Sequence, residues 1–247
     1  MTRMVRAELL KLRRNRSVWI GAGLVVFALP LALLAMTVLV DRGRLGGTDR
    51  TIVTMALLLG PGLIGAALIG TTAGAADREA GVLRSLASTG VPRSTLFWVR
   101  LPAVLVAAVL LATAAWAFSC VLGAVIHVGT PPVTVGWALE QLPSLLLGNV
   151  VIAVATLGLC SAGLPGAAVL GFVLALTLGL MPVLVSSDVT PDWLFALMPP
   201  VAVTELAGGQ TIVGEVPVPV GWALASVAAW TLGALAIGLD RLRRAEL

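Results

Sequence analysis

Few side chains in this sequence are of the types that carry out chemistry, and their spacing fits no common site. The two cysteines, Cys120 and Cys160, both lie inside apolar runs, and His127 is the one histidine. Two cysteines in separate apolar segments are more typical of small core residues than of a disulfide or a metal pair, and no zinc-ligand spacing occurs. We therefore predict no metal site on this chain.

The sequence also lacks the motifs of common enzyme classes. It contains no Gly-x-Ser-x-Gly and no His-Glu-x-x-His segment, which mark serine hydrolases and zinc proteases. It contains no Gly-x-x-x-x-Gly-Lys-Ser/Thr phosphate loop, and its only lysine is Lys11. We predict a chain with no catalytic residues and no cofactor of its own. A membrane-embedded enzyme and an assembly scaffold are the alternatives.

The composition is that of an integral membrane protein. Of the 247 residues, 59% are hydrophobic and 11% are charged, and the mean hydropathy is +1.04. Soluble chains are about 25% charged. These values exclude a disordered chain, a secreted disulfide scaffold and a nucleic-acid-binding domain. The excess of 16 Lys and Arg over 12 Asp and Glu must therefore be sorted by membrane side before it is interpreted.

Six apolar runs are long enough to cross a bilayer as helices, since a crossing takes about 20 residues. They contain Leu, Val and Ala throughout, without the alternation of polar and apolar residues that strands would show. The predicted spans are 18–40, 52–76, 101–128, 143–162, 166–185 and 218–239. The expected fold is all-α: a polytopic membrane protein with six transmembrane helices in a single domain, residues 1–247.

Lys and Arg residues are distributed unevenly between the two sides that six spans define. Thirteen lie before the first span, between the second and third, or after the sixth, and three lie between the first and second. The long segment 186–217 has no basic residue. Because loops rich in Lys and Arg stay in the cytoplasm, both termini are predicted to be cytoplasmic, in the inner or plasma membrane. Segment 186–217 is then extracytoplasmic.

The central portions of the six runs contain no ionisable residue. Arg100, His127 and Glu140 lie at segment ends, where their side chains can reach the interface. A carrier driven by protons or sodium ions normally needs an ionisable group near the middle of the membrane. The sequence therefore favours an external energy source over ion coupling.

The polar residues inside the apolar runs could contact cargo or bond backbone, and the small residues could pack helices together. Asn149, Thr156 and Thr177 are candidates for orienting a hydrophobic or amphipathic cargo, or they bond neighbouring backbone. Gly70 and Gly74 have the small-xxx-small spacing that lets helices approach closely in lipid. That approach is expected within the chain, against a second subunit, or both.

Two segments outside the spans are predicted to meet the membrane surface. In 1–16, an apolar stripe of Met1, Val5, Leu9 and Leu12 lies opposite several arginines. This pattern is typical of an interfacial helix near anionic lipid, and an ordinary basic flank is the alternative. Segment 193–206 is apolar enough to re-enter the outer leaflet, and a surface loop is the alternative.

The segment 77–93 between the second and third spans is predicted to form a short cytoplasmic helix. Asp77 can cap its start, and Gly90 followed by Val91 and Pro92 is a stop signal. Such a helix either docks a partner protein or serves as a stiff loop.

Residues in this segment and at the start of the chain resemble those of a known family. The residues that carry the resemblance are Glu79-x-Gly81-x-Leu83-x-x-Leu86, Thr89-Gly90-x-Pro92-Arg93 and Arg100-Leu101-Pro102, with Arg6 to Arg13 running into Ser17-Val18-Trp19 at the start. They resemble the signature and the N-terminal elbow helix of type-2 ATP-binding-cassette exporter permeases. Such permeases have six spans and short re-entrant helices before the last one.

The resemblance implies a permease that pairs with a second permease, identical or homologous, and with two ATPase subunits that hold ATP and Mg. The helix between spans 2 and 3 would transmit closure of the ATPase. The candidate coupling residues on this chain are Asp77, Arg78, Glu79, Gly81, Leu83, Arg84, Leu86, Gly90 and Arg93. A permease for a specialised cargo such as haem is the alternative within transport.

Overall fold

The computed structural model describes residues 2–28, 30–32, 60–75, 93–126, 135–180, 194–195, 197–207 and 218–244. These residues are almost all helical, and no strand occurs among them. The predicted all-α class is therefore confirmed for the part of the chain that the structure describes. The apolar runs form helices because a backbone in lipid must satisfy its polar groups within its own segment.

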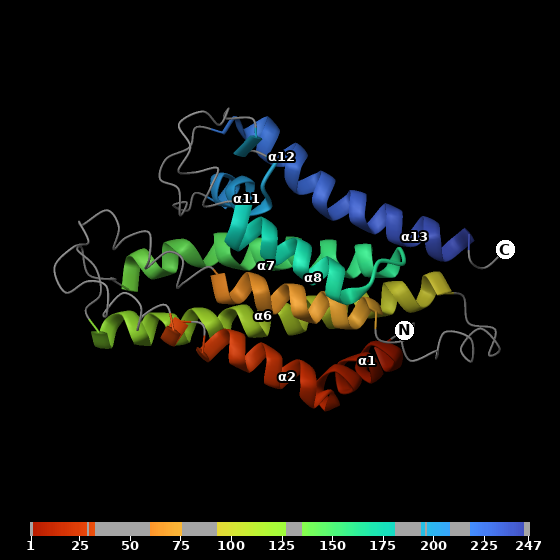
Figure 1. Cartoon of the computed structure of the whole chain (residues 1–247), viewed down its shortest axis with the longest axis horizontal. Helices are drawn as coiled ribbons and strands as arrows, with labels where there is room; N and C mark the ends of the chain where they lie inside the picture. The colour runs from red at the N-terminus through yellow and green to blue at the C-terminus, as the bar shows by residue number, and fades with distance from the viewer. Residues whose placement is uncertain are drawn as a thin grey trace.

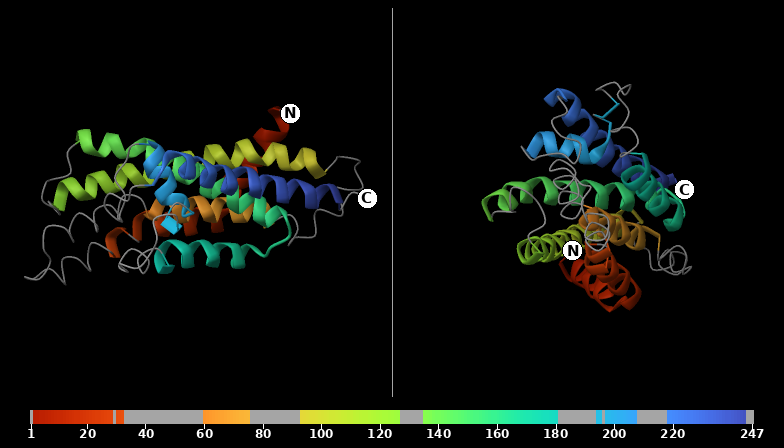
Figure 2. Two further views of the ribbon diagram at one scale, coloured as in Figure 1. Left: turned by 90° about the horizontal axis from the view of Figure 1, so that it is seen from above. Right: turned by 60° about the vertical axis from the view of Figure 1, so that its left-hand side comes forward.

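The helices run lengthwise beside one another in a bundle (Figures 1 and 2). Those that carry labels are α1 (Thr2–Arg14), α2 (Arg16–Gly23), α6 (Arg93–Ile126), α7 (Val135–Ser161), α8 (Gly166–Leu174), α11 (Pro199–Ala207), α12 (Val220–Ala228) and α13 (Ala234–Arg244). Three π-helical segments continue or join them, namely η1 (Leu24–Ala28), η2 (Ala175–Leu180) and η3 (Ala229–Gly233). Residues 60–75 form a further helix.

Three helices among the described residues are long and apolar enough to cross a membrane. They are Ser94–Leu122, Ala138–Ser161 and Val220–Arg244. A fourth is obtained if Arg3–Arg14 and Val18–Ala32, which meet at 68°, count as one bent span. The chain is thus a multi-pass membrane protein, and the count of six spans stays a prediction.

Both termini lie at one end of the bundle (Figure 1). Helix 60–75 ends there, α6 begins there, and α7 turns into α8 there. The turn is tight because Gly163 has a φ of 112° and the amide of Leu164 donates to the Leu159 carbonyl, a bond pattern that closes a helix at a left-handed residue. Pro165 then precedes α8. An even number of crossings fits this arrangement.

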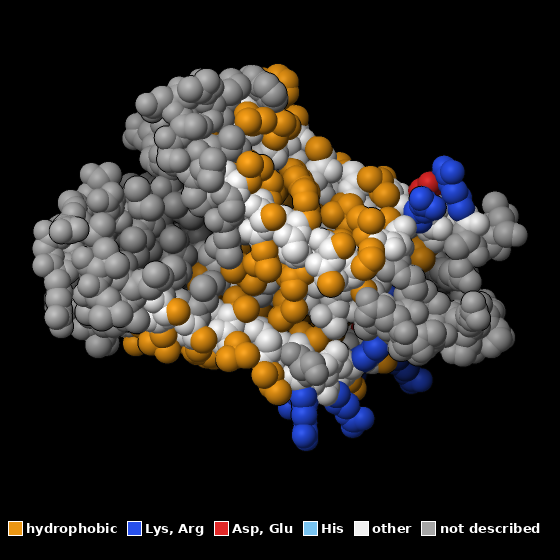
Figure 3. Space-filling model, in the orientation of Figure 1, with side chains coloured by type: hydrophobic (Ala, Val, Ile, Leu, Met, Phe, Trp, Pro, Cys, Tyr) orange, Lys and Arg blue, Asp and Glu red, His pale blue; other side chains and the backbone are white. Residues whose placement is uncertain are grey.

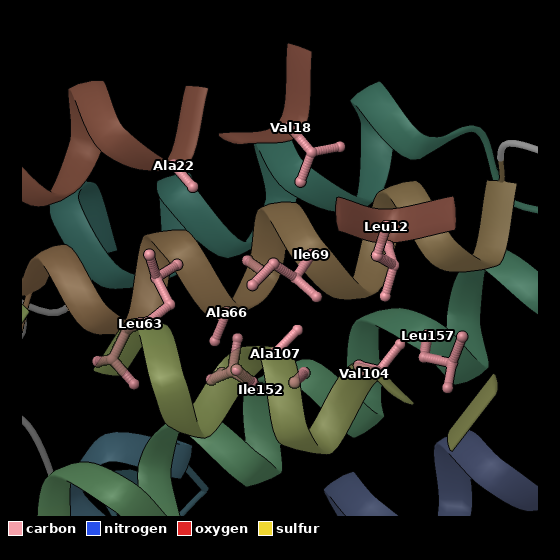
Figure 4. Close-up of a cluster of buried hydrophobic side chains, with 14 of the residues drawn as sticks. Leu12, Val18, Ala22, Leu63, Ala66, Ile69, Val104, Ala107, Ile152 and Leu157 are labelled. Atoms are coloured by element: carbon pink, nitrogen blue, oxygen red, sulfur yellow. The ribbon is translucent and has the colours of Figure 1, made fainter. Parts of the chain in front are cut away.

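The core lies around α7, which contacts α6, α11 and α13. The main apolar cluster joins α1, α2, helix 60–75, α6 and α7 (Figure 4). The labelled members in that view are Leu12, Val18, Ala22, Leu63, Ala66, Ile69, Val104, Ala107, Ile152 and Leu157. Many are small, which suits a bilayer protein, because lipid is as apolar as the core and close packing must hold the helices together.

Glycines mark the two closest helix approaches. Gly70 and Gly74 face α7, and a Cβ built on Gly70 would lie 2.5 Å from the carbonyl oxygen of Ala153. On the other side of α7, a Cβ on Gly238 of α13 would lie 2.8 Å from the carbonyl oxygen of Gly158. The predicted close approach at Gly70 and Gly74 is therefore made within the chain.

Candidate functional site

Most of the predicted coupling segment lies outside the described residues. This applies to Asp77, Arg78, Glu79, Gly81, Leu83, Arg84, Leu86 and Gly90, and only the backbone of Arg93 is described, as the first residue of α6. The two flanks are described. Ala75, at the end of helix 60–75, is 3% exposed and packs with Cys160 and Val169. Phe97, in the first turns of α6, is also buried. The segment is thus joined at both ends to helices that are packed into the bundle.

Arg100 is enclosed by protein. Its place in the sequence predicted a segment end from which it could reach the interface, but Arg100 is only 6% exposed. Its neighbours on the same helix, Val99 and Val104, are buried as well. Glu140 is exposed near the start of α7, as expected, and His127 lies outside the described residues.

The N-terminal helix α1 is amphipathic, and its apolar stripe packs on the bundle. Leu12 is buried in the main cluster, Leu9 packs against that cluster, and α1 contacts α6. Leu9 and Leu12 of the predicted stripe thus face the protein, and the interfacial position of α1 stays a prediction. Its arginines, such as Arg6 and Arg13, are exposed.

The bend between α1 and α2 is held by hydrogen bonds to the end of α1. The backbone amide of Asn15 donates to the Lys11 and Leu12 carbonyls. The indole Nε1 of Trp19 donates to the Leu12 carbonyl at 2.9 Å. The last carbonyls of a helix lack an N–H donor within it. The Leu12 carbonyl therefore accepts from both the Asn15 amide and the Trp19 indole, and the Trp19 bond fixes α2 against α1.

The visible cationic side chains lie in the half of the molecule nearer the termini, some of them along its lower edge, and apolar side chains cover the middle of the visible face (Figure 3). The C-terminal contribution comes from the last turn of α13, with Arg241, Arg243 and Arg244. Arg244 pairs with Asp240 at 2.9 Å, but both side chains are more than half exposed, so the pair adds little stability. Among the described residues, the visible face thus has an apolar middle and its cationic side chains in the half nearer the termini.

The candidate pathway residues Asn149 and Thr156 are fully buried on α7. The Asn149 amide donates to the Leu145 carbonyl at 2.7 Å, and the Thr156 hydroxyl donates to the Ile152 carbonyl at 2.8 Å. Both side chains lie against helix 60–75, next to Gly62 and Gly70 respectively. Thr177 lies in η2, and its side chain is outside the described part. The structure does not bring Thr156 and Asn149 together with Thr177 at a described cavity, and their pathway role stays a prediction.

The comparison with protein families decides the class. The family model described as ABC-2 family transporter protein matches residues 4–185, which run from α1 to beyond η2. The chain belongs to the ABC-2 transporter family. A comparison with curated proteins finds no match.

Membership in the ABC-2 family makes this chain a permease component of an ABC transporter, a component that is not itself catalytic. ABC-2 permeases associate with an ABC ATPase and often with a second permease. The matched region includes the basic α1, the packed helix 60–75 and the start of α6. The last membrane helix, Val220–Arg244, lies beyond it.

Three tryptophans join different parts of this ABC-2 chain by bonds that the sequence did not predict. Their indole hydrogen bonds are Trp19 Nε1 to Leu12 O at 2.9 Å, Trp116 Nε1 to Ala138 O at 3.0 Å and Trp230 Nε1 to Leu197 O at 2.9 Å. The available signal was chemical, because an indole N–H away from water needs an acceptor. Trp116 and Trp230 lie 22 and 33 residues from their acceptors along the chain, and this distance hid those two pairings.

Proposed function

We propose that this chain is the membrane-spanning permease subunit of an ATP-driven exporter. With a second permease, identical or homologous, it forms the pathway for a hydrophobic or amphipathic substrate. The family match is the observation that carries the proposal. The absence from the sequence of a phosphate loop, and of ionisable residues at the centre of the apolar runs, supports an energy source on a separate chain.

Coupling runs through segment 77–93 in this proposal. ATP and Mg bind to two copies of the ATPase, whose closure displaces the segment. Support comes from its flanks: helix 60–75 packs against α6 and α7, and α6 packs against α1 and α7. A displacement of the segment would therefore act on helices at the centre of the bundle and not on a peripheral one.

The proposed topology has six spans with both termini in the cytoplasm. Support comes from the position of both termini at one end of the bundle and from the cationic side chains in the half of the molecule nearer the termini, since cytoplasmic flanks are rich in Lys and Arg. Segment 193–206, which includes most of α11, then belongs to the outer end as the predicted re-entrant region.

The function is tested by purification and reconstitution. We expect an ABC ATPase to co-purify with the full chain, and substrate transport into vesicles to require ATP. A panel of amphipathic compounds should stimulate the ATPase of the assembled complex and so identify the substrate class. Transport driven by a pH or sodium gradient alone, without an ATPase, would contradict the proposal.

The topology is tested by single-cysteine labelling in sealed cells, in a variant that lacks the two native cysteines. A cysteine at Asp188 should react with an impermeant maleimide from outside, and one at Arg244 should react only after the cells are opened. The charge asymmetry of the flanks is the physical reason. Labelling of both positions from the same side would rule out the six-span arrangement.

A further inference from the structure

One tryptophan connects three segments near the end of the chain. Trp230 lies in η3, inside the last membrane helix, and its Nε1 donates to the Leu197 carbonyl at 2.9 Å. Its ring stacks on Phe172 of α8, with centroids 6.1 Å apart and planes 27° apart. Leu197 lies in the turn that leads into α11. A single side chain of the last span thus contacts both α8 and the turn that leads into α11.

The Leu197 carbonyl needs this donor because of the residues that follow it. Pro199 and Pro200 open α11 and have no N–H group. The first amides of the helix, those of Val201 and Ala202, both donate to the Met198 carbonyl, at 3.1 and 3.0 Å. In a regular helix the Leu197 carbonyl would accept from the amide of residue 200 or 201. Here Pro200 has no amide hydrogen, and the Val201 amide donates to Met198. The Trp230 indole takes over that role.

The rest of α11 is held by packing. Its residues Val201, Ala202 and Val203 are at most 1% exposed, and the helix contacts α7 and α12. Apolar packing is non-directional, whereas the indole bond specifies one pair of atoms. That bond is at the start of α11, towards the end of the bundle opposite the two termini (Figure 1).

The last span is irregular where it supplies the indole. The π-helical turn of η3 interrupts the regular helix at Ala229–Gly233, and such turns commonly occur where a helix performs a special role. The Thr231 hydroxyl donates to the Val227 carbonyl at 2.6 Å, so a carbonyl in this stretch has a side-chain donor. Trp230 thus lies in the π-helical turn that interrupts its own helix.

We propose that Trp230 is a latch that fixes the start of α11 to the last membrane span, and that loss of the indole bond to Leu197 loosens the start of α11. The latch controls how readily this end of the permease opens; this last clause rests on the proposed function.

The latch is tested by hydrogen exchange with mass spectrometry on the full chain in lipid nanodiscs. Trp230→Phe keeps an aromatic ring and removes only the N–H donor. We expect amides in 198–207 to exchange about five- to tenfold faster, as the loss of one hydrogen bond implies. The matched control is Trp222→Phe, in α12, whose side chain is 56% exposed and whose substitution should leave exchange unchanged.

Two results would overturn the latch. One is unchanged exchange in 198–207 for Trp230→Phe. The other is faster exchange throughout α7 as well, which would mean that Trp230 supports the whole bundle. The measurement uses no cargo, ATP or ATPase, so its failure is separate from a failure of the proposed function, which the reconstituted vesicles report.

Discussion

Replacing Leu83 with aspartate is expected to abolish substrate-stimulated ATPase activity in the assembled transporter. The resemblance places Leu83 among the apolar residues of the coupling segment. A carboxylate at an apolar contact loses its hydration without gaining a partner, which costs several kcal/mol. Losing about 3 kcal/mol of contact energy lowers the coupled population about a hundredfold. Stimulated and basal ATPase rates of the purified complex, measured side by side, check this.

The control for Leu83→Asp is Leu164→Asp. Leu164 is 46% exposed in the turn between α7 and α8, at the same end of the bundle (Figure 1). We expect that variant to retain stimulation and normal membrane insertion. Charge reversal at Glu79 or Arg84 should also lower substrate-stimulated ATPase activity. Wild-type stimulation in Leu83→Asp would refute the assignment of segment 77–93 to coupling.

Replacing Gly70 with leucine is expected to destabilise the bundle severely. A Cβ at this position would lie 2.5 Å from the Ala153 carbonyl oxygen and would meet the Thr156 hydroxyl. Since backbone is among the obstructing atoms, helix 60–75 and α7 must separate. Overpacking of a core typically costs about 1–3 kcal/mol, and the loss of a helix–helix contact adds to it. The measurement is the fraction of monodisperse protein that survives a heating series in detergent.

Two further glycines calibrate that result. Gly171 of α8 has nothing within 4 Å of a built Cβ, so Gly171→Leu should behave like the wild type. The stability of Gly62→Ala should fall between those of the Gly70 and Gly171 variants. Its Cβ would meet only the Asn149 side chain, at 2.9 Å, and a side chain can move. Equal stability of the Gly70 and Gly171 variants would show that the packing of helix 60–75 against α7 is not as described.

The helical class and membrane setting were predictable because each span carries its own signal in its hydropathy. The direction that an apolar surface faces was not. The stripe that includes Leu9 and Leu12 fits lipid and protein equally well, since both are apolar, and the structure turns it toward α6. In the same way, the spacing of Gly70 and Gly74 predicted a close approach but did not identify α7 as the neighbour.

The start of α7 shows a second limit. The predicted span began at Pro143, because Glu140 and Gln141 lower the hydropathy just before it, whereas the helix begins at Val135. A helix can extend past the apolar layer, and its ends follow hydrogen bonding and packing instead of hydropathy. Gln141 is 2% exposed, so its polar side chain is enclosed by protein.

The candidate coupling site stays a prediction, because residues 76–92 lie outside the described part of the chain. The structure shows only that helix 60–75 ends, and α6 begins, at the end of the bundle where both termini lie. The bonds from Trp19 and Trp230 were not predictable, because each acceptor is a backbone carbonyl whose availability depends on how another segment folds.

The burial of α7 has a mechanical consequence. Of its most apolar stretch, 67% is enclosed by the chain's own helices, compared with 17% for the last membrane helix. A helix surrounded in this way cannot rotate or tilt without displacing α6, α11, α13 and helix 60–75 together. During a transport cycle α7 would therefore stay largely in place, and the helices packed around it, which include helix 60–75 and α6, would move relative to it.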